Sequence, residues 1–133
     1  MVDLFALAKK DRFLRELGVE LVEASAGRAV MRVTVAERHL NFNGFGHGGL
    51  TFSLADAAFG IACNSHGVMA GGVDVHMIYN KTVQLGDVLS ATAVEISRTA
   101  KLSHYRIDVA RADGTMVAAM TGTAYISGQP HGG

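Results

Sequence analysis

The pattern of apolar and polar positions predicts an N-terminal helix, one long apolar helix and a β-rich second half. Apolar residues recur at helical spacing over residues 3–17, and Gly18 is suited to end that helix. Residues 48–64 are almost all apolar or small, which is typical of a helix buried on every side. Gly67 is suited to end this second helix.

Alternation with a period of two predicts the strands. Residues 19–23 and 28–35 are expected to form a hairpin around Gly27. Further strands are expected at residues 73–80, 87–98, 102–111 and 116–127. About five long antiparallel strands can bury an apolar helix by wrapping around it, which predicts an α+β fold. One sheet cannot cover the far side of that helix, so we expect a second copy of the chain there.

Length and composition narrow the class of protein. The 133 residues predict a single domain over 1–133, with a disordered tail from about residue 128. Twelve basic and twelve acidic residues balance, which argues against nucleic-acid or membrane-surface partners. The single cysteine, Cys63, excludes an internal disulfide framework and suits a reducing compartment, so we expect a cytoplasmic protein. No signal-peptide pattern is evident, and the longest apolar stretch is too short to span a bilayer.

Asp56 stands in the middle of the apolar helix, just after a glycine-rich loop at residues 36–47. A lone buried carboxylate is expensive without a role or a partner, and perturbed titratable groups cluster at functional sites. The helix begins with Gly48 and Gly49, whose backbone N–H groups a ligand oxygen could approach closely. This combination favours an oxyanion site. The alternatives are that the glycines only shape a turn and that Asp56 only pairs with hydroxyl or backbone groups.

The spacing of Gly48 and Asp56 carries a geometric consequence. They are eight residues apart, or roughly 12 Å along one helix. Reacting atoms must approach to about 3–3.5 Å, so the two groups of one chain cannot act on the same carbonyl. If both are functional, they come from different subunits, and the active site lies at a dimer interface.

Other chemistries have less support. The loop lacks the Lys-Ser/Thr of a nucleotide P-loop, and no serine stands in a Gly-x-Ser-x-Gly elbow. The six histidines include no i,i+4 pair with a third ligand nearby, so we expect no metal site.

The segment Asn41-x-x-Gly44-x-x-His47-Gly48-Gly49, followed by Phe52-Ser-Leu-Ala-Asp56-x-Ala-Phe59, resembles the hotdog-fold acyl-CoA thioesterases. The likeness is closest to the phenylacetic-acid-degradation (PaaI-type) group and extends from about residue 17 to 126. It implies a hotdog fold and an acyl-CoA substrate, with no cofactor apart from the coenzyme A that is part of this substrate. It also implies at least a homodimer, with a homotetramer expected.

The resemblance also implies roles for individual residues. The Gly48 N–H would polarise the thioester carbonyl, and Asp56 of the neighbouring subunit would act as general base or nucleophile. Asn41 and His47 would orient the substrate, the loop or the water. The remaining substrate-binding candidates are Gly49, Phe52, Phe59, Tyr79, Lys81, Arg98 and Lys101.

This chain departs from its relatives in two places. Some relatives carry a water-holding Ser or Thr shortly before the strand that follows the helix, where this chain has Gly71 and Gly72. Relatives often have Arg-Pro after an aromatic at the end of that strand, where this chain has Asn80-Lys81. Lys81, Arg98 and Lys101 are therefore the candidates for contact with the coenzyme A phosphates.

Two other functions fit the same fold. Hotdog dehydratases or hydratases pair a histidine with a carboxylate on the central helix, whereas His47 precedes the helix, which favours hydrolysis. Non-catalytic acyl-CoA-binding hotdog proteins lose the helix carboxylate, whereas this chain keeps Asp56. Aromatic acyl groups suit the resemblance, but the sequence does not specify the acyl group.

Overall fold

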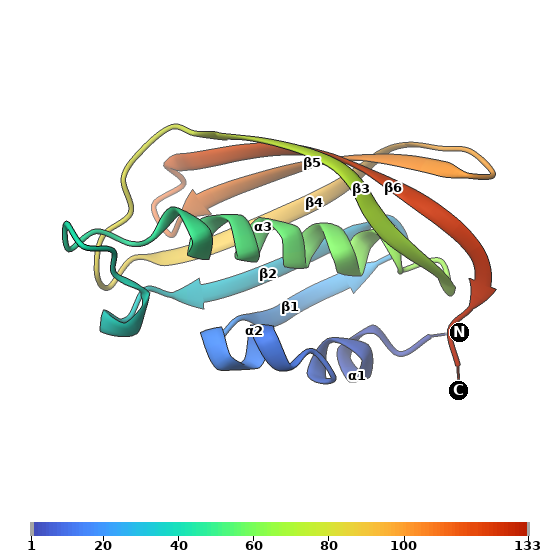
Figure 1. Cartoon of the computed structure of the whole chain (residues 1–133), viewed down its shortest axis with the longest axis horizontal. Helices are drawn as coiled ribbons and strands as arrows, with labels where there is room; N and C mark the ends of the chain where they lie inside the picture. The colour runs from blue at the N-terminus through green and yellow to red at the C-terminus, as the bar shows by residue number, and fades with distance from the viewer. Residues whose placement is uncertain (1, 133) are drawn as a thin grey trace.

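A six-stranded antiparallel sheet curves around one long helix in this protein, whose computed structural model describes residues 2–132 (Figure 1). The strand order is β1-β2-β4-β5-β6-β3. The elements are α1 (Leu4–Lys9), α2 (Arg12–Leu17), β1 (Glu20–Ser25), β2 (Arg28–Thr34), a 3₁₀ turn (Glu37–His39), α3 (Gly48–Cys63), β3 (Val68–Tyr79), β4 (Val88–Arg98), β5 (Leu102–Arg111) and β6 (Met116–Pro130). This is the α+β architecture expected of a hotdog fold, and each of the six strand segments predicted from the sequence forms a strand.

The core lies between α3 and the concave face of the sheet. Alternate residues of the central strands point inward, since side chains alternate across a strand. Phe59 of α3 is only 1% exposed, and its ring lies 5.6 Å from that of Tyr105. A Cβ at Gly72 or Gly122 would come within 2.7 or 2.9 Å of this ring, so both strands need glycine there. Phe59, expected to line a substrate pocket, is therefore a core residue in this chain.

The N-terminal segment forms two helices where the sequence predicted one. The side chain of Asp3 caps α1, and that of Asp11 caps α2 by accepting from the Leu14 N–H. An N-cap residue has extended rather than helical backbone angles, so Asp11 interrupts the apolar periodicity and restarts the helix. Gly18 ends α2 in the left-handed conformation, as expected.

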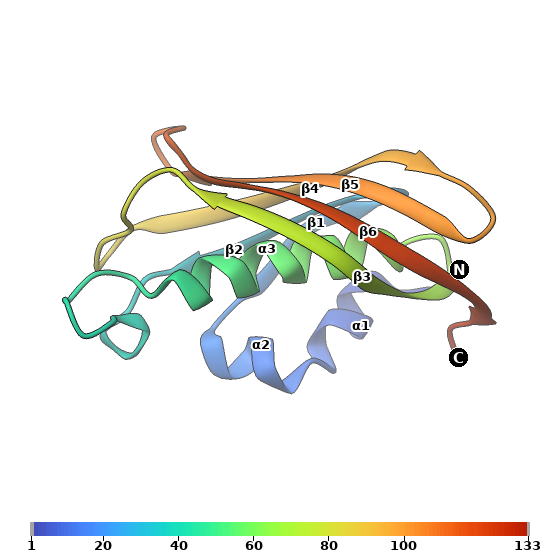
Figure 2. The same cartoon turned by 45° about the horizontal axis from the view of Figure 1, so that its top comes forward.

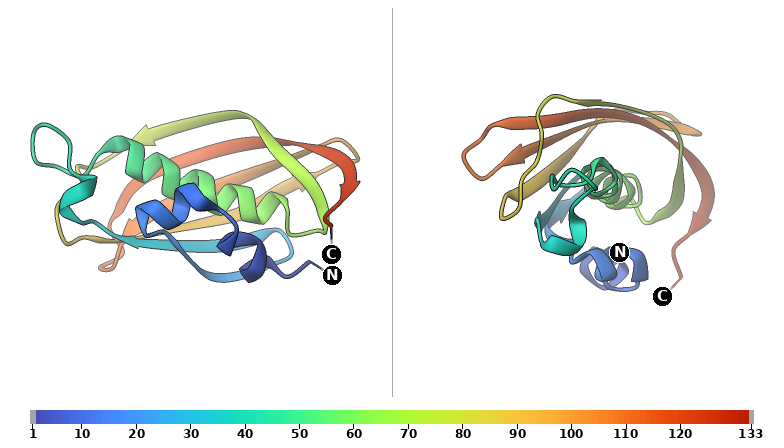
Figure 3. Two further views of the ribbon diagram at one scale, coloured as in Figure 1. Left: turned by 60° about the horizontal axis from the view of Figure 1, so that its bottom comes forward. Right: turned by 60° about the vertical axis from the view of Figure 1, so that its left-hand side comes forward.

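These two short helices lie on the side of α3 that faces away from the sheet (Figures 2 and 3). Leu14 is their only buried residue. They cover α3 incompletely: Phe52, Ser53 and Gly60 are partly exposed, and Asp56 is exposed. The expectation that α3 is buried on every side is therefore wrong for a single chain, because one face of the helix remains open.

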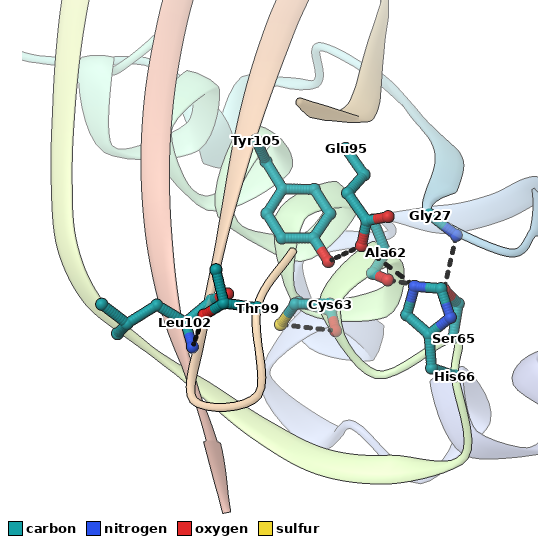
Figure 4. A network of polar contacts seen from close by, with 10 residues as sticks. Gly27, Ala62, Cys63, Ser65, His66, Glu95, Thr99, Leu102 and Tyr105 are labelled. Atoms are coloured by element: carbon teal, nitrogen blue, oxygen red, sulfur yellow. Dashed lines mark hydrogen bonds and ion pairs between the residues drawn. The ribbon is translucent and has the colours of Figure 1, made fainter. Parts of the chain in front are cut away.

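A polar network fixes the C-terminal end of α3 to the sheet (Figure 4). The Tyr105 hydroxyl donates to Glu95 Oε1 at 2.8 Å, and His66 Nε2 lies 2.9 Å from the same oxygen. Ser65 Oγ accepts from the Gly27 N–H at 2.8 Å, which joins the β1–β2 hairpin to the end of α3. Burial raises the pKa of Tyr105 well above its usual value, and the bond to Glu95 adds to this, so the phenol stays protonated and donates.

β3 and β6 are longer than expected. β3 begins at Val68 and runs through Gly71 and Gly72, which the sequence placed before the strand. β6 reaches Pro130, which pairs with Val68, and the His131 N–H donates to the Gly67 carbonyl. This backbone pairing orders residues 128–131, in contrast to the disordered tail expected from about residue 128.

Among the described residues, no helix is long and apolar enough to cross a membrane.

Candidate active site

The loop before α3 is shaped by Asn41. Its Oδ1 accepts from the backbone N–H groups of Asn43 and Phe45 at 2.9 and 3.1 Å, which folds the loop back on itself. Gly46 then donates to the Val83 carbonyl at 2.6 Å, so close that a Cβ there would lie 2.7 Å from the Val83 side chain. Asn41 therefore acts on the shape of the loop, which positions the residues that follow it.

His47 is the N-cap of α3, and its Nδ1 accepts from the Gly49 N–H at 2.8 Å. An accepting Nδ1 carries no proton, so in the neutral ring the proton is on Nε2, which can donate to a ligand. The Gly48 N–H donates to no acceptor within residues 2–132. Because it belongs to the first turn of the helix, this N–H also lies at the positive end of the helix dipole. The start of α3 thus presents one unbonded donor.

Asp56 lies in a groove between α3 and the N-terminal helices. The groove has a volume of about 570 Å³ and is lined by Leu7, Ala8, Lys10, Asp11, Phe13, Leu14, Phe52, Ser53, Asp56, Ala57, Gly60, Ile61, Asn64 and His131. Although the Asp56 side chain is exposed in this chain, the neighbouring side chains of the groove exclude part of the surrounding water. This burial raises the pKa of Asp56, and the negative charge of Asp11 raises it further.

The two parts of the expected site occupy separate hollows of the chain. Neither His47 nor Gly48 lines the groove of Asp56. His47 and Gly49 instead border a smaller cavity of about 230 Å³ near Arg38 and Leu50. The separation agrees with the length of helix between Gly48 and Asp56, and the groove holds the Asp56 carboxylate without the other expected catalytic residues.

The structure divides the substrate-binding candidates between the two ends of the molecule. The Tyr79 hydroxyl donates to the Gly48 carbonyl at 3.2 Å, so Tyr79 and the following Lys81 lie at the start of α3. Arg98 ends β4, and Lys101 directly precedes β5. Both therefore lie in the β4–β5 hairpin, at the opposite end of the sheet (Figure 1). One chain therefore does not bring all three basic residues together.

Several residues of the Asp56 groove were not identified from the sequence. Ser53 lies one helical turn before Asp56, and Asp11 and His131 approach from the two ends of the chain. Residues three apart on a helix lie on the same face, so the sequence alone could have placed Ser53 beside Asp56. The positions of Asp11 and His131 had no such signal, because they depend on how the chain ends pack against α3.

Cys63 adds no reactive thiolate near this groove. Burial raises the pKa of Cys63 to about 11, and the charge of Asp56 adds to the effect, so the thiol stays protonated. No group of three or more metal-ligating side chains is present in residues 2–132.

Comparison with known proteins assigns the family. Residues 43–118 match the sequence profile of the thioesterase superfamily. A putative esterase of Archaeoglobus fulgidus is 35% identical over 88% of this chain and 76% of its own. The acyl-coenzyme A thioesterase PaaI of Escherichia coli is 32% identical over 90% of this chain and 86% of its own. The chain belongs to the thioesterase superfamily.

Solved structures agree with this assignment. The E. coli PaaI protein superposes with a TM-score of 0.91 at 31% identity, covering 94% of this chain and 91% of that one. A Streptococcus mutans protein bound to acetyl-CoA superposes with a TM-score of 0.81 at 26% identity, covering 85% and 91% of the two chains.

Proposed function

We propose that this protein hydrolyses acyl-CoA thioesters to a free acid and coenzyme A, at a site assembled from two subunits. The observation that carries the proposal is Asp56, a carboxylate with a raised pKa in an apolar groove, held on the same helix as the unbonded Gly48 N–H but about 12 Å from it. The names of the E. coli relative and of the CoA-bound neighbour support the substrate class.

In the reaction, the Gly48 N–H of one subunit binds the thioester oxygen and stabilises the negative charge that develops there. Asp56 of the other subunit takes a proton from water, whose oxygen attacks the carbonyl carbon. The tetrahedral intermediate collapses, the C–S bond breaks, and the leaving thiolate takes up the proton. The products are the acid and coenzyme A, and the reaction as proposed needs no cofactor or metal beyond the substrate itself.

Asp56 could also attack the carbonyl directly and form an acyl-aspartyl anhydride, which water would then hydrolyse. The two routes differ in the fate of the carboxylate oxygens. In a single turnover in H₂¹⁸O, mass spectrometry of the Asp56 peptide detects the label only if water attacks the aspartyl carbon of an anhydride.

Other residues assist in this proposal. His47 Nε2–H orients the substrate or the water while Nδ1 holds the helix start, and Asn41 keeps the loop in shape. Gly49, Phe52 and Tyr79 border the bound substrate. Lys81 is assigned to a coenzyme A phosphate at the start of α3, and Arg98 and Lys101 are the further candidates, contributed by the partner subunit.

The edge of the sheet supports the proposal of a homodimer. β3 ends the strand order, so one side of its backbone has no strand to pair with in this chain. It also exposes Met69, Val73, Ile78 and Tyr79, each at least half accessible to solvent. Pairing of β3 with β3 of a second copy covers this edge, and we expect it to let Asp56 of one subunit reach the Gly48 N–H of the other.

We further propose a tetramer. Leu102 and Tyr125 are paired neighbours on β5 and β6, and they alternate with the buried Ser103 and Ala124. They therefore point away from α3 and form, with the exposed Ile96, an apolar area on the outer face of the sheet, where we expect two dimers to associate. Analytical ultracentrifugation over a range of concentrations measures the size of the assembly.

We place the protein in the cytoplasm, where the single thiol of Cys63 stays reduced.

The test is hydrolysis of a panel of short-, medium-, long-chain, aryl and phenylacetyl-CoAs, with thiol release as the readout. Asp56→Asn should lower turnover roughly 100-fold or more, because it removes the base and keeps the shape. Asp113→Asn, an acidic residue in the β5–β6 turn, is the matched control and should leave turnover unchanged. Hydration of trans-2-enoyl-CoA is measured alongside. Enoyl-CoA hydration without thioester hydrolysis, or a fully active folded Asp56→Asn protein, contradicts the proposal.

A further inference from the structure

The groove of Asp56 continues past the carboxylate toward the C-terminal end of α3. Its floor is one helix face, on which Asp56, Gly60 and Asn64 follow at intervals of four residues. From Asp56 to Asn64 the floor extends about 12 Å. The opposite wall includes apolar side chains of α1 and α2, among them Leu7 and Phe13, and the charged Lys10 and Asp11 lie between the two helices. A largely apolar passage therefore leads away from the carboxylate within the chain that supplies it.

Gly60 is midway along this passage and is the one floor position without a side chain. A Cβ at Gly60 would have no atom within 4 Å, whereas at Gly72 and Gly122 it would press on Phe59. Glycine is a poor residue for a helix interior, and packing within this chain does not require it at position 60. The absent side chain leaves space in the groove rather than in the core.

Asn64 and His131 close the far end of the passage. His131 Nε2 lies 2.8 Å from Asn64 Oδ1, and because an amide oxygen only accepts, the proton is on Nε2. Asn64 Nδ2 donates to the Gly60 and Ala70 carbonyls at 2.8 and 3.0 Å, and its Oδ1 also accepts from the Ala70 N–H. Asn64 is thus held rigidly, and a polar pair stands where the apolar walls end.

We propose that Gly60 is a specificity-determining residue, over which the acyl chain of the substrate passes from the thioester at Asp56 toward the Asn64–His131 pair. This inference rests on the proposed thioesterase function and deepens it. The passage is lined largely by apolar side chains and is about 12 Å long, so it fits a linear acyl chain of medium length. Phe52 and Ile61 flank the acyl chain in this passage.

The variants Gly60→Ala and Gly60→Leu add side chains of increasing size to the floor. Ala112→Leu is the matched control, since it adds apolar volume at an exposed position in the β5–β6 turn, outside the groove. We compare kcat and KM for acetyl-CoA and decanoyl-CoA. Each methylene group excluded from an apolar site weakens binding roughly fourfold. Gly60→Leu should therefore raise KM for decanoyl-CoA by about tenfold or more and change the acetyl-CoA kinetics by less than about twofold.

Binding provides a readout that does not depend on turnover. S-decyl-CoA and S-ethyl-CoA, thioethers that cannot be hydrolysed, are titrated calorimetrically into each variant. Gly60→Leu should weaken only the decyl compound, Gly60→Ala should have a smaller effect of the same kind, and both variants should melt at or above the wild-type temperature.

Three outcomes are decisive. An unchanged preference for chain length in Gly60→Leu overturns the inference. An equal loss for both chain lengths, together with a smaller assembly in ultracentrifugation, also overturns it, because Gly60 then packs against a partner subunit. If wild-type protein hydrolyses no acyl-CoA but decyl-CoA binding still depends on Gly60, the proposed function fails while the assignment of the groove stands.

Discussion

The hydroxyl of Tyr79 donates a hydrogen bond to the backbone carbonyl of Gly48 over 3.2 Å, and thereby ties the end of β3 to the first residue of α3. A Cβ on Gly48 would lie 3.5 Å from the Tyr79 ring, so the ring also borders the helix start. The residue that offers the unbonded N–H is thus held by the strand that forms the edge of the sheet.

Tyr79→Phe keeps the ring and removes this bond. We expect a loss of unfolding free energy of at most about 1 kcal/mol, because the bond is exposed to water, and a fall of a few-fold in kcat/KM as the helix start loosens. Urea denaturation and steady-state kinetics measure the two effects. A loss of activity above about 100-fold in a folded protein would instead assign the phenol a direct part in the chemistry.

The raised pKa of Asp56 predicts how activity depends on pH. The carboxylate must be ionised to act, so kcat/KM should fall on acidification, with a midpoint above the ordinary value of 3.8. Asp11→Asn removes a neighbouring negative charge, and asparagine still caps α2. In the Asp11→Asn variant, the fall of kcat/KM on acidification should therefore occur at lower pH, while the maximal kcat/KM stays the same. A shift to higher pH, or none, would contradict the coupling of Asp11 to Asp56.

The same pKa shift has a consequence for stability. A carboxyl group whose pKa is higher in the folded state destabilises the fold above that pKa, and the effect disappears below the unfolded value. Asp56→Asn should therefore be at least as stable as wild type at pH 7, and the difference should shrink as the pH approaches 3.8. Thermal melts of both proteins across this range measure it.

The two-subunit site predicts complementation between inactive variants. Gly48→Pro deletes the donor N–H at a helix position that tolerates proline, and Asp56→Asn deletes the base. Each variant alone should be nearly inactive. Mixed dimers should regain one working site, which joins Gly48 of the Asp56→Asn chain to Asp56 of the Gly48→Pro chain. Differently tagged chains, purified as heterodimers, are assayed for thiol release.

The control is that both variants fold and exchange subunits, which circular dichroism and pull-down of the second tag establish. Verified heterodimers without activity, or an active monomer, would refute the shared site.

The hydrogen bond between Tyr105 and Glu95 predicts that removing the acceptor lowers stability more than removing the donor. Glu95→Ala leaves the buried Tyr105 hydroxyl without its acceptor and removes the contact with His66, so we expect a loss of about 2 kcal/mol. Tyr105→Phe removes the donor but leaves Glu95 partly exposed and paired with His66, so its effect should be smaller. Urea denaturation ranks the two variants. Turnover should remain near wild type in both, because the network lies at the opposite end of α3 from Gly48.

The sequence by itself determined the elements and the main chemistry. A continuous run of apolar and small residues predicted α3, and alternation with a period of two predicted the strands, both close to their observed positions, because burial determines which positions of each element are apolar. The loop Asn41–Gly49 and the isolated carboxylate of Asp56 predicted the family and the catalytic candidates. The length of helix between Gly48 and Asp56 predicted that one chain holds only half of the site, since the helical rise is the same in every protein.

Only the tertiary structure decided what surrounds these residues. The open face of α3, the core position of Phe59 and the separation of Lys81 from Lys101 follow from how the sheet curves and which strands become neighbours. Asp11 and His131 are far apart in the chain, and they meet at the Asp56 groove because α1, α2 and the end of β6 pack against the same helix face. Such contacts depend on many weak interactions summed over the whole fold, and no local pattern of residues records them.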